Sequence, residues 1–242
     1  MVITLIIAGL AGGLMPLLIK WDDRKLHIAL SLSTGIFLGA IFLHMIPESY
    51  ASWAIENSAT IVQGSNLQAY NMWATVLISV VIIYFLKAIF VKPQRNSELQ
   101  QHIALSYASF LGLSLHALAV GLSLAIPNLN TGILLGLASH KIFESFSLAS
   151  IFLLAQFKPK KIIILVMLFA SITPIGMILG NNIFPELPAE YRATAVAIAL
   201  GTFLYVSISE LLPEVFHNKK DIQLKITLII VGIIGVGMLH HD

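Results

Sequence analysis

Cysteine is absent from the 242 residues, which excludes disulfides and thiolate metal ligands. Charge is scarce as well. Asp, Glu, Lys and Arg make up 11% of the chain, whereas an ordinary soluble domain carries roughly a quarter. Apolar residues account for 57% of the sequence, and the mean hydropathy is +0.89. The shortage of charge argues against a soluble domain. It predicts a polytopic protein whose surroundings are a lipid bilayer, with no nucleic-acid partner.

Long polar segments are also lacking. The loops between apolar stretches are compact, and none holds a second domain or a low-complexity tract. We therefore expect one integral domain over residues 1–242. Residues 1–20 lack a basic n-region and an A-x-A cleavage site, so they predict a retained helix rather than a signal peptide.

Eight apolar stretches are present, and most approach the roughly 20 residues that cross a bilayer core of about 30 Å. They predict an all-α integral membrane fold with eight transmembrane helices. The stretches are Val2–Ile19, Ile28–Tyr50, Met72–Val91, Ile103–Ile126, Gly132–Phe157, Ile162–Asn181, Ala193–Pro213 and Leu224–Leu239.

Basic residues gather on alternate loops. Of the 14 Lys and Arg residues, all except Lys141 and Arg192 lie in or beside the first, third, fifth and seventh loops. Because basic loops tend to stay in the cytoplasm, these loops are predicted to be cytoplasmic and both termini non-cytoplasmic. The membrane would be a plasma membrane or a bacterial inner membrane.

The sequence contains two internal matches. One pairs Gly35–Leu38 and His44–Glu48 with Gly201–Leu204 and Glu210–Glu214, in the second and seventh stretches, which cross in opposite directions. The other pairs His116 and Ser123–Ala125 with His140 and Ser147–Ala149, in the fourth and fifth stretches. Inverted repeats are typical of transporters, because one structural unit can open to either side. We predict that helices 1–3 repeat as helices 6–8, with helices 4 and 5 central.

Ionisable side chains interrupt the two central stretches: His116, His140, Lys141 and Glu144. Such groups are costly in hydrocarbon and mark functional sites. His140 and Glu144 lie four residues apart and share one helix face, and the helical rise brings both to the depth of His116. Imidazole and carboxylate are ligands for zinc and its neighbours in the divalent series. The pattern predicts a midmembrane metal site formed by His116, His140 and Glu144.

Simpler interpretations remain for some of these residues. His116 taken alone is also typical of a hydrogen-bonded histidine between helices. Lys141 is either part of the transport pathway, a structural ion pair with Glu144 three residues on, or a snorkelling lysine. His44 and Glu48, near the outer end of the second helix, are either entrance groups that capture metal or interfacial polar caps. Glu210 and Glu214, near the cytoplasmic end of the seventh helix, pose the same choice, with Glu210 favoured as a pathway residue.

The chain resembles the ZIP-type divalent-metal transporters over essentially its full length. His116–Gly121 is similar to the family's helix-four motif and His140–Glu144 to its helix-five motif. Ser171–Gly176 and Gly201–Glu214 resemble its sixth and seventh helices. The His140-Lys141 pairing resembles the branch that includes the Zip1-like eukaryotic members. The resemblance implies eight helices, external termini, metal uptake toward the cytoplasm and a homodimer.

The chain departs from the family at its second metal position. Many relatives bind two ions, with an Asn and acidic residues at positions that match Ala117, Val120, Lys141 and Thr173 here. An ammonium beside a dication in a low dielectric is strongly repulsive, so we expect a single-metal site. The loop before the fourth helix contains only His102, so the His-rich segment common in the family is missing.

We therefore expect a transporter, with zinc favoured and iron(II), manganese or cadmium also compatible with two imidazoles and a carboxylate. No cofactor is expected beyond the transported ion. An intramembrane zinc hydrolase is a rival function, but no H-E-x-x-H motif is present and an inverted repeat serves no purpose in it. A metal-sensing or structural protein on the same scaffold is a further alternative.

Overall fold

The computed structural model describes residues 1–19, 21–47, 49–50, 67–90, 97–124, 131–183 and 189–238, and the regular structure in these ranges is helical. The helices up to the centre of the chain are α1 (Val2–Leu18), α2 (Asp23–Gly39), the π-helical η1 (Ala40–Met45), α5 (Leu67–Phe90), α6 (Glu98–Ser123) and α7 (Thr131–Leu154). They are followed by α8 (Pro159–Ile183), α9 (Ala189–Tyr205), the π-helical η2 (Val206–Leu211), α10 (Leu212–His217) and α11 (Ile222–Met238).

Six helical segments of the described chain are long and apolar enough to cross a membrane. They are α2 with η1, α5, α6, α7, α8, and α9 continued through η2 and α10. The apolar helices α1 and α11 have 17 residues each, or about 26 Å at the helical rise, slightly less than a core of about 30 Å. The chain is thus a multi-pass helical membrane protein.

Two helices begin earlier than the apolar stretches predict. Helix α2 starts at Asp23 rather than Ile28, and the Asp22 carboxylate caps it by accepting a hydrogen bond from the Lys25 backbone N–H at 2.8 Å. Helix α6 starts at Glu98 rather than Ile103, capped by the Ser97 hydroxyl. Side-chain caps of this kind allow a polar first turn. His102 therefore lies in a helix, which corrects its assignment to a loop.

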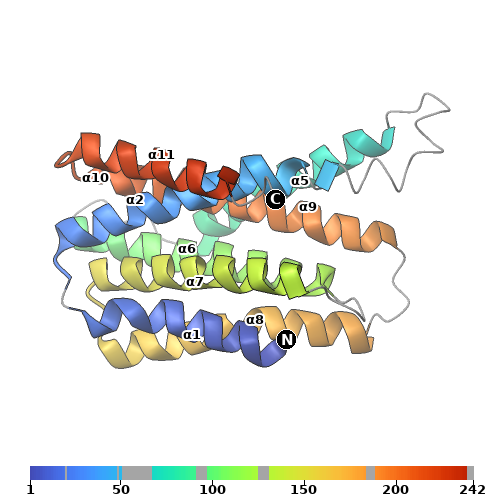
Figure 1. Ribbon diagram of the computed structural model, residues 1–242, viewed down its shortest axis with the longest axis horizontal. Helices are drawn as coiled ribbons and strands as arrows, with labels where there is room; N and C mark the ends of the chain where they lie inside the picture. Colours follow the sequence, from blue (N-terminus) through green and yellow to red (C-terminus); the bar gives the residue numbers. More distant parts are fainter. Residues whose placement is uncertain are drawn as a thin grey trace.

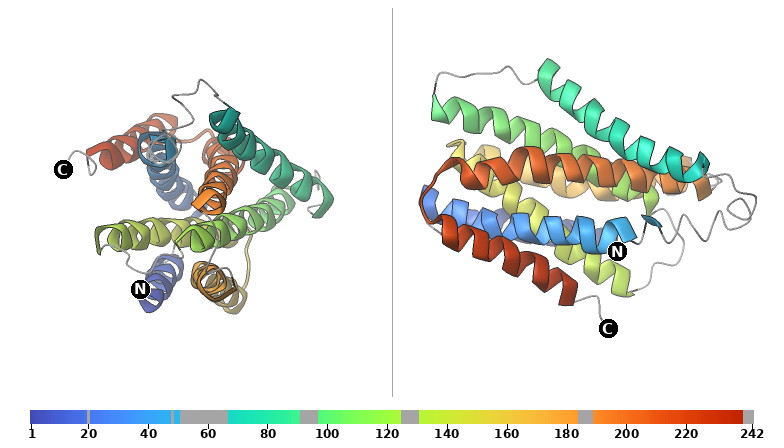
Figure 2. Two further views of the ribbon diagram at one scale, coloured as in Figure 1. Left: turned by 90° about the vertical axis from the view of Figure 1, so that its right-hand side faces the viewer. Right: turned by 90° about the horizontal axis from the view of Figure 1, so that it is seen from above.

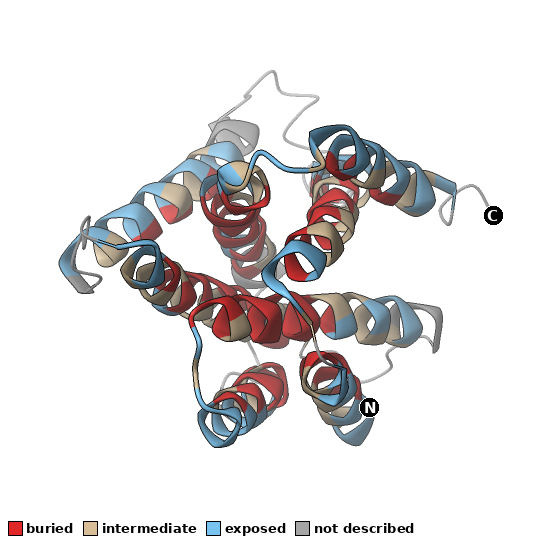
Figure 3. Ribbon diagram, turned by 90° about the vertical axis from the view of Figure 1, so that its left-hand side faces the viewer, coloured by how far each residue is buried: buried red, intermediate tan, exposed pale blue. Residues whose placement is uncertain are grey.

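The bundle has three layers, with α6 and α7 in the middle (Figure 1 and Figure 2). Helices α1 and α8 cover one side of this pair, and α2 and α9 cover the other. Helix α11 packs outside α2, and α5 packs outside α9. Buried residues concentrate where the outer helices face α6 and α7 (Figure 3). The central pair therefore carries its polar side chains at the best-protected position in the molecule.

The outer helices present apolar side chains outward. Only 17% of the spanning window of α5 is buried, against 61% for the span that contains α9. Large exposed apolar residues on α5 include Leu77, Tyr84, Phe85 and Ile89. An apolar exterior of this extent suits a lipid solvent, because association with hydrocarbon carries no penalty for such a surface.

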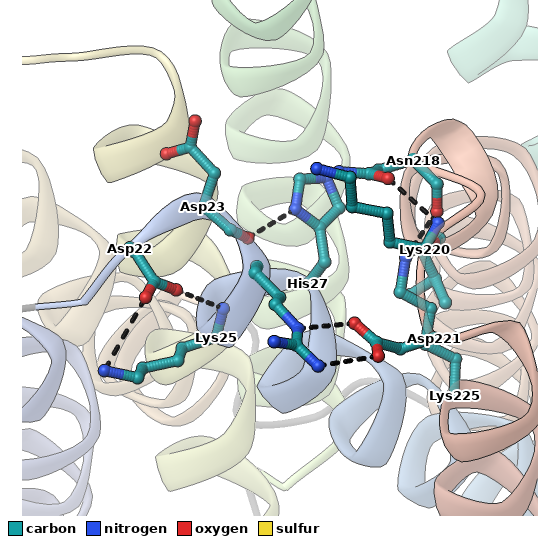
Figure 4. Close-up of polar contacts among 10 residues, drawn as sticks. Asp22, Asp23, Lys25, His27, Asn218, Lys220, Asp221 and Lys225 are labelled. Carbon is teal, nitrogen blue, oxygen red and sulfur yellow. Dashed lines mark hydrogen bonds and ion pairs between the residues drawn. The ribbon is translucent and has the colours of Figure 1, made fainter.

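An ion pair joins α2 to the start of α11 at the end of the bundle that carries the basic loops. The Arg24 guanidinium donates two hydrogen bonds to the Asp221 carboxylate, at 2.6 and 2.8 Å (Figure 4). This guanidinium holds the pKa of Asp221 below its usual value. The contact is largely exposed on the Arg24 side, so it fixes geometry more than it adds stability.

Candidate metal site

His116, His140 and Glu144 meet at the interface of α6 and α7. Glu144 Oε1 lies 3.1 Å from His116 Nε2 and 3.1 Å from His140 Nε2, and the two imidazole nitrogens are 3.4 Å apart. His116 and Glu144 are each 1% exposed, and His140 is partly buried. The structure thus brings together the three side chains that the helix spacing and depth select.

The spacing of these atoms matches the coordination sphere of a small metal ion. Tetrahedral zinc, with ligands at about 2.0–2.1 Å, places them about 3.3–3.4 Å from one another. Glu144 Oε1 is buried and has no hydrogen-bond partner of suitable geometry in the described part of the chain. A buried carboxylate oxygen without a donor is costly, and a cation bound between it and the two imidazoles would remove that cost.

The orientation of His116 is fixed from the far side of its ring. His116 Nδ1 lies 2.7 Å from the backbone carbonyl oxygen of Ala199 on α9. A carbonyl only accepts, so Nδ1 carries the proton and Nε2 presents its lone pair toward Glu144. Metal-binding histidines commonly use such a backbone contact to set the tautomer. His116 is therefore both an interhelical histidine and a ligand-ready one.

Lys141 occupies the other oxygen of the same carboxylate. Its ammonium is 3.2 Å from Glu144 Oε2 and lies 3.7 Å from the centroid of the Phe169 ring. The side chain is 3% exposed, so it does not snorkel to the interface. Only Oε1 of Glu144 remains available to an ion, so this carboxylate can form a single bond to a metal.

Two phenylalanines form an apolar wall beside the histidines. The Phe203 ring stacks on His116 with centroids 4.5 Å apart and meets His140 edge-on at 4.8 Å. Phe37 lies 6.1 Å from His140 and 4.9 Å from Phe203. Their packing keeps the imidazoles in one place and removes competing water from that side.

A small cavity adjoins the three candidate ligands. It is lined on its other sides by Ala117, Val120, Lys141 and Thr173, together with Leu5 and Leu137. The first four of these residues are the positions at which the resemblance described above places the ligands of a second metal. In this chain their side chains offer no carboxylate or imidazole, and one of them is a cation.

The predicted pathway residues lie in different surroundings. His44 is half-buried in η1, and Glu48 lies outside the described residues. Glu210 is buried in η2, where it accepts hydrogen bonds at 2.7 Å from both Lys87 and Tyr205. Glu214 is buried in α10 and faces His27 at 3.2 Å and His102 at 3.1 Å. Of the predicted pathway residues that the structure describes, His44, Glu210 and Glu214 are not among those that surround the central site.

Several features of the site were beyond sequence reasoning. The Ala199 carbonyl and the Phe203 ring come from α9, and no local pattern signals which backbone oxygen or which ring faces His116. Phe37 and Phe203 had one usable signal, since they occupy the same place in the Gly-x-Phe-Leu repeat. His27 was overlooked and His102 was assigned to a loop, because each lies in the polar sequence immediately before an apolar stretch.

Comparison with known proteins gives a consistent picture. A family model described as "ZIP Zinc transporter" matches residues 1–92 and 91–240. Protein zntD of Dictyostelium discoideum is 32% identical over 149 residues, 58% of this chain and 22% of that protein. Zinc transporter ZIP1 of Danio rerio is 27% identical over 133 residues, 52% of this chain and 44% of that protein. Fe(2+) transport protein 3, chloroplastic, of Arabidopsis thaliana is 26% identical over 151 residues, 57% and 36% of the two chains. Each match spans less than half the length of the relative.

Proposed function

The chain belongs to the ZIP zinc transporter family, and from this premise we propose that it carries a divalent transition-metal ion across the membrane through a site formed by His116, His140 and Glu144. One observation carries the assignment. Three ligand atoms from two adjacent helices converge within 3.4 Å in the buried middle of the bundle, where an ionisable group has no structural advantage over an apolar one. The family consists of transporters, so the hydrolase interpretation is abandoned.

Zinc is the favoured cargo. Two imidazoles and one carboxylate oxygen form a common zinc ligand set that leaves a position open for exchange. Several of the similar proteins are named as zinc transporters and another as an Fe(2+) transport protein, so iron(II) is the nearest alternative. Manganese and cadmium belong to the same class of ion and differ in preferred ligands.

The central site holds one ion. Glu144 has a single free oxygen because Lys141 binds the other, and the neighbouring positions Ala117, Val120 and Thr173 supply no charged ligand. Lys141, whose contact with Glu144 causes this restriction, also belongs to the His140-Lys141 pairing that resembles the Zip1-like branch.

We further propose eight transmembrane helices in one domain over residues 1–242, with helices 1–3 and 6–8 related as an inverted repeat. Equivalent helices make equivalent contacts, since α2 packs on α11 as α9 packs on α5. The π-helices η1 and η2 fall at matching places in the repeat. Repeat-related Phe37 and Phe203 also meet each other beside the histidines.

The loop charges support an orientation with both termini outside and the basic loops in the cytoplasm, and the family resemblance supplies uptake toward the cytoplasm as the direction of transport. An ion would enter past His44 and Glu48, lose its water to the central ligands, and leave toward Glu210 and Glu214. A homodimer is part of this proposal and rests on the family resemblance. Chemical cross-linking in the membrane, which would give a doubled mass, tests it.

Uptake into proteoliposomes tests the function. Zinc, iron(II), manganese and cadmium are supplied one at a time to vesicles that contain wild type, His140→Ala or Glu144→Ala. We expect uptake by wild type, fastest for zinc, and a loss to background in both variants, whose folding is checked by circular dichroism. A metal-sensing protein on this scaffold would bind the ions without moving them. Wild-type rates in both variants would refute the site.

A further inference from the structure

A second set of two histidines and one glutamate lies far from the central site. Glu214 Oε1 is 3.2 Å from His27 Nε2 and 3.1 Å from His102 Nε2. The three side chains come from three different helices, α10, α2 and α6, and all three are at least nine-tenths buried. We propose that His27, His102 and Glu214 bind a second divalent transition-metal ion.

The geometry repeats that of the central site. One carboxylate oxygen faces two Nε2 atoms, and the ligand atoms of the three residues lie within 4.8 Å of one another. His27 Nδ1 lies 2.6 Å from the backbone carbonyl of Asp23 (Figure 4), so Nδ1 carries the proton and Nε2 is a free ligand. The Ala199 carbonyl fixes His116 in the same way.

The three ligand atoms are not satisfied by one another. His27 Nε2, His102 Nε2 and Glu214 Oε1 are all buried, and none has a hydrogen-bond partner of suitable geometry among the described residues. Three buried and unsatisfied polar atoms at one point are rare in a folded protein. A metal ion among them would bind all three at once.

The charged groups around His27, His102 and Glu214 favour a bound cation more than those around the central site do. Within the described chain, no lysine or arginine lies in ion-pair contact with Glu214, whereas Lys141 binds Glu144. The nearby Lys225 ammonium is held instead by the carbonyl oxygens of Val215 and Asn218, at 2.8 and 2.6 Å. The cluster keeps one uncompensated carboxylate for a dication.

The two sites are separate. His102 and His116 are on the same helix, and the helical rise places them roughly 21 Å apart. His27 and His102 are the fifth residues of α2 and α6, and Glu214 lies in the first turn of the short helix α10, all at the end with the basic loops. An ion released by the central site would meet this cluster before cytoplasmic water, a role that rests on the proposed function, while the binding itself does not.

A competing cluster shares one residue. Glu98, His102 and His217 also place ligand atoms near one another, but Glu98 and His217 are exposed and 3.8 Å apart. Exposed groups are satisfied by water, so this set lacks the unsatisfied atoms that argue for an ion. Substitutions that separate the two sets decide which of them binds.

Equilibrium dialysis of the purified chain against zinc, followed by elemental counting, tests the inference. Wild type is expected to hold two ions per chain. The double variant His27→Ala, Glu214→Gln is expected to hold one ion per chain. The matched control, Glu98→Gln with His217→Ala, should keep two. The double variant His116→Ala, Glu144→Gln should hold one ion per chain. A quadruple variant that carries all four of these binding-site substitutions should hold no ion. A count of two after His27→Ala with Glu214→Gln would overturn the proposal, as would a wild-type count of one that disappears with the central pair.

A ligand substitution separates metal binding from structure. His102→Ala should leave one ion, whereas His102→Cys supplies a thiolate, itself a zinc ligand, and should restore two. A purely structural histidine would give the same count in both variants, and that result would refute its role as a ligand. Counting ions requires no transport, so an inactive chain with two ions would refute the proposed function and leave this site standing.

Discussion

Lys141 determines which ligand atoms the proposed central site offers to an ion. Its ammonium binds one oxygen of Glu144 and lies on the Phe169 ring, so a metal finds two imidazoles and a single oxygen. A transport site must bind weakly enough to let go. A nearby cation weakens the hold on a dication by direct repulsion, and we interpret Lys141 as the group that keeps release fast.

The first prediction replaces this lysine. Lys141→Asp exposes both Glu144 oxygens and adds a carboxylate, so zinc should bind at least tenfold more tightly and uptake should slow. Ala117→Asn, Val120→Glu and Lys141→Asp together should raise the zinc count of the central site from one to two. The count is made in the His27→Ala, Glu214→Gln background, where only the central site remains. An unchanged count in the triple variant would show that Lys141 has a packing role alone.

At the scale of residues, much of the central site could be predicted from sequence. The i, i+4 spacing of His140 and Glu144, together with the depth of His116, identifies three residues that the structure brings into contact. The Ala199 carbonyl could not be predicted, because backbone acceptors carry no sequence signal. The Lys141 contact was one of several open alternatives, and only tertiary packing decides between them.

Helices α2 and α9 each pack closely against an outer helix through a glycine at the same place in the sequence repeat. Gly35 of α2 faces the backbone of Ile229 on α11, and Gly201 of α9 faces that of Val76 on α5. A Cβ at either glycine would collide with a carbonyl oxygen of the neighbouring helix. Small residues of this kind allow close helix approach in membranes. The two glycines hold the same place in the repeat, and each fixes an outer helix.

The second prediction tests these contacts. Gly35→Ala and Gly201→Ala should each destabilise the chain by about 1–3 kcal/mol through overpacking against rigid backbone. Gly235 and Gly136 are matched controls, because a Cβ there meets nothing within 4 Å. Their alanine variants should melt at or above the wild-type temperature, since alanine favours helix. Thermal melts in detergent compare the four variants, and equal melting temperatures would contradict the packing argument.

At the scale of elements, the apolar stretches predicted the helices but not where they begin. Hydropathy detects only the apolar part of α2 and α6. The N-cap residues Asp22 and Ser97 allow these helices to start earlier, in polar sequence. The polar N-terminal segments of the two helices carry His27 and His102. The π-helical turns at η1 and η2 left no sequence signal either, because an extra residue in one turn changes no composition.

The whole molecule combines an apolar exterior with one strongly basic end. The fold class was predictable because charge is scarce and apolar stretches are long. The packing order of the helices was not, because lipid-facing and protein-facing sides of a membrane helix are both apolar. The proposed orientation rests on the loop charges, and it sets which end of the bundle would receive the ion.

The third prediction concerns that orientation. Single cysteines at Ser65 and Asn130 should react with an impermeant thiol reagent applied from outside, whereas a cysteine at Ser97 should react only after the membrane is opened. The chain has no native cysteine, so each label reports one position. The opposite pattern would reverse the direction of transport inferred here.

The contact between Lys141 and Glu144 also has an electrical consequence. One ammonium and one carboxylate cancel, so the empty central site carries no net charge, and the site with its ion carries the full charge of the dication. A negative interior favours inward passage of two charges by about 4.6 kcal/mol per 100 mV, while the return of the empty site is indifferent to voltage. In the proposed cycle the membrane potential would therefore drive the movement of the ion toward the cytoplasm, and it would not oppose the return of the empty site to its outward-facing state.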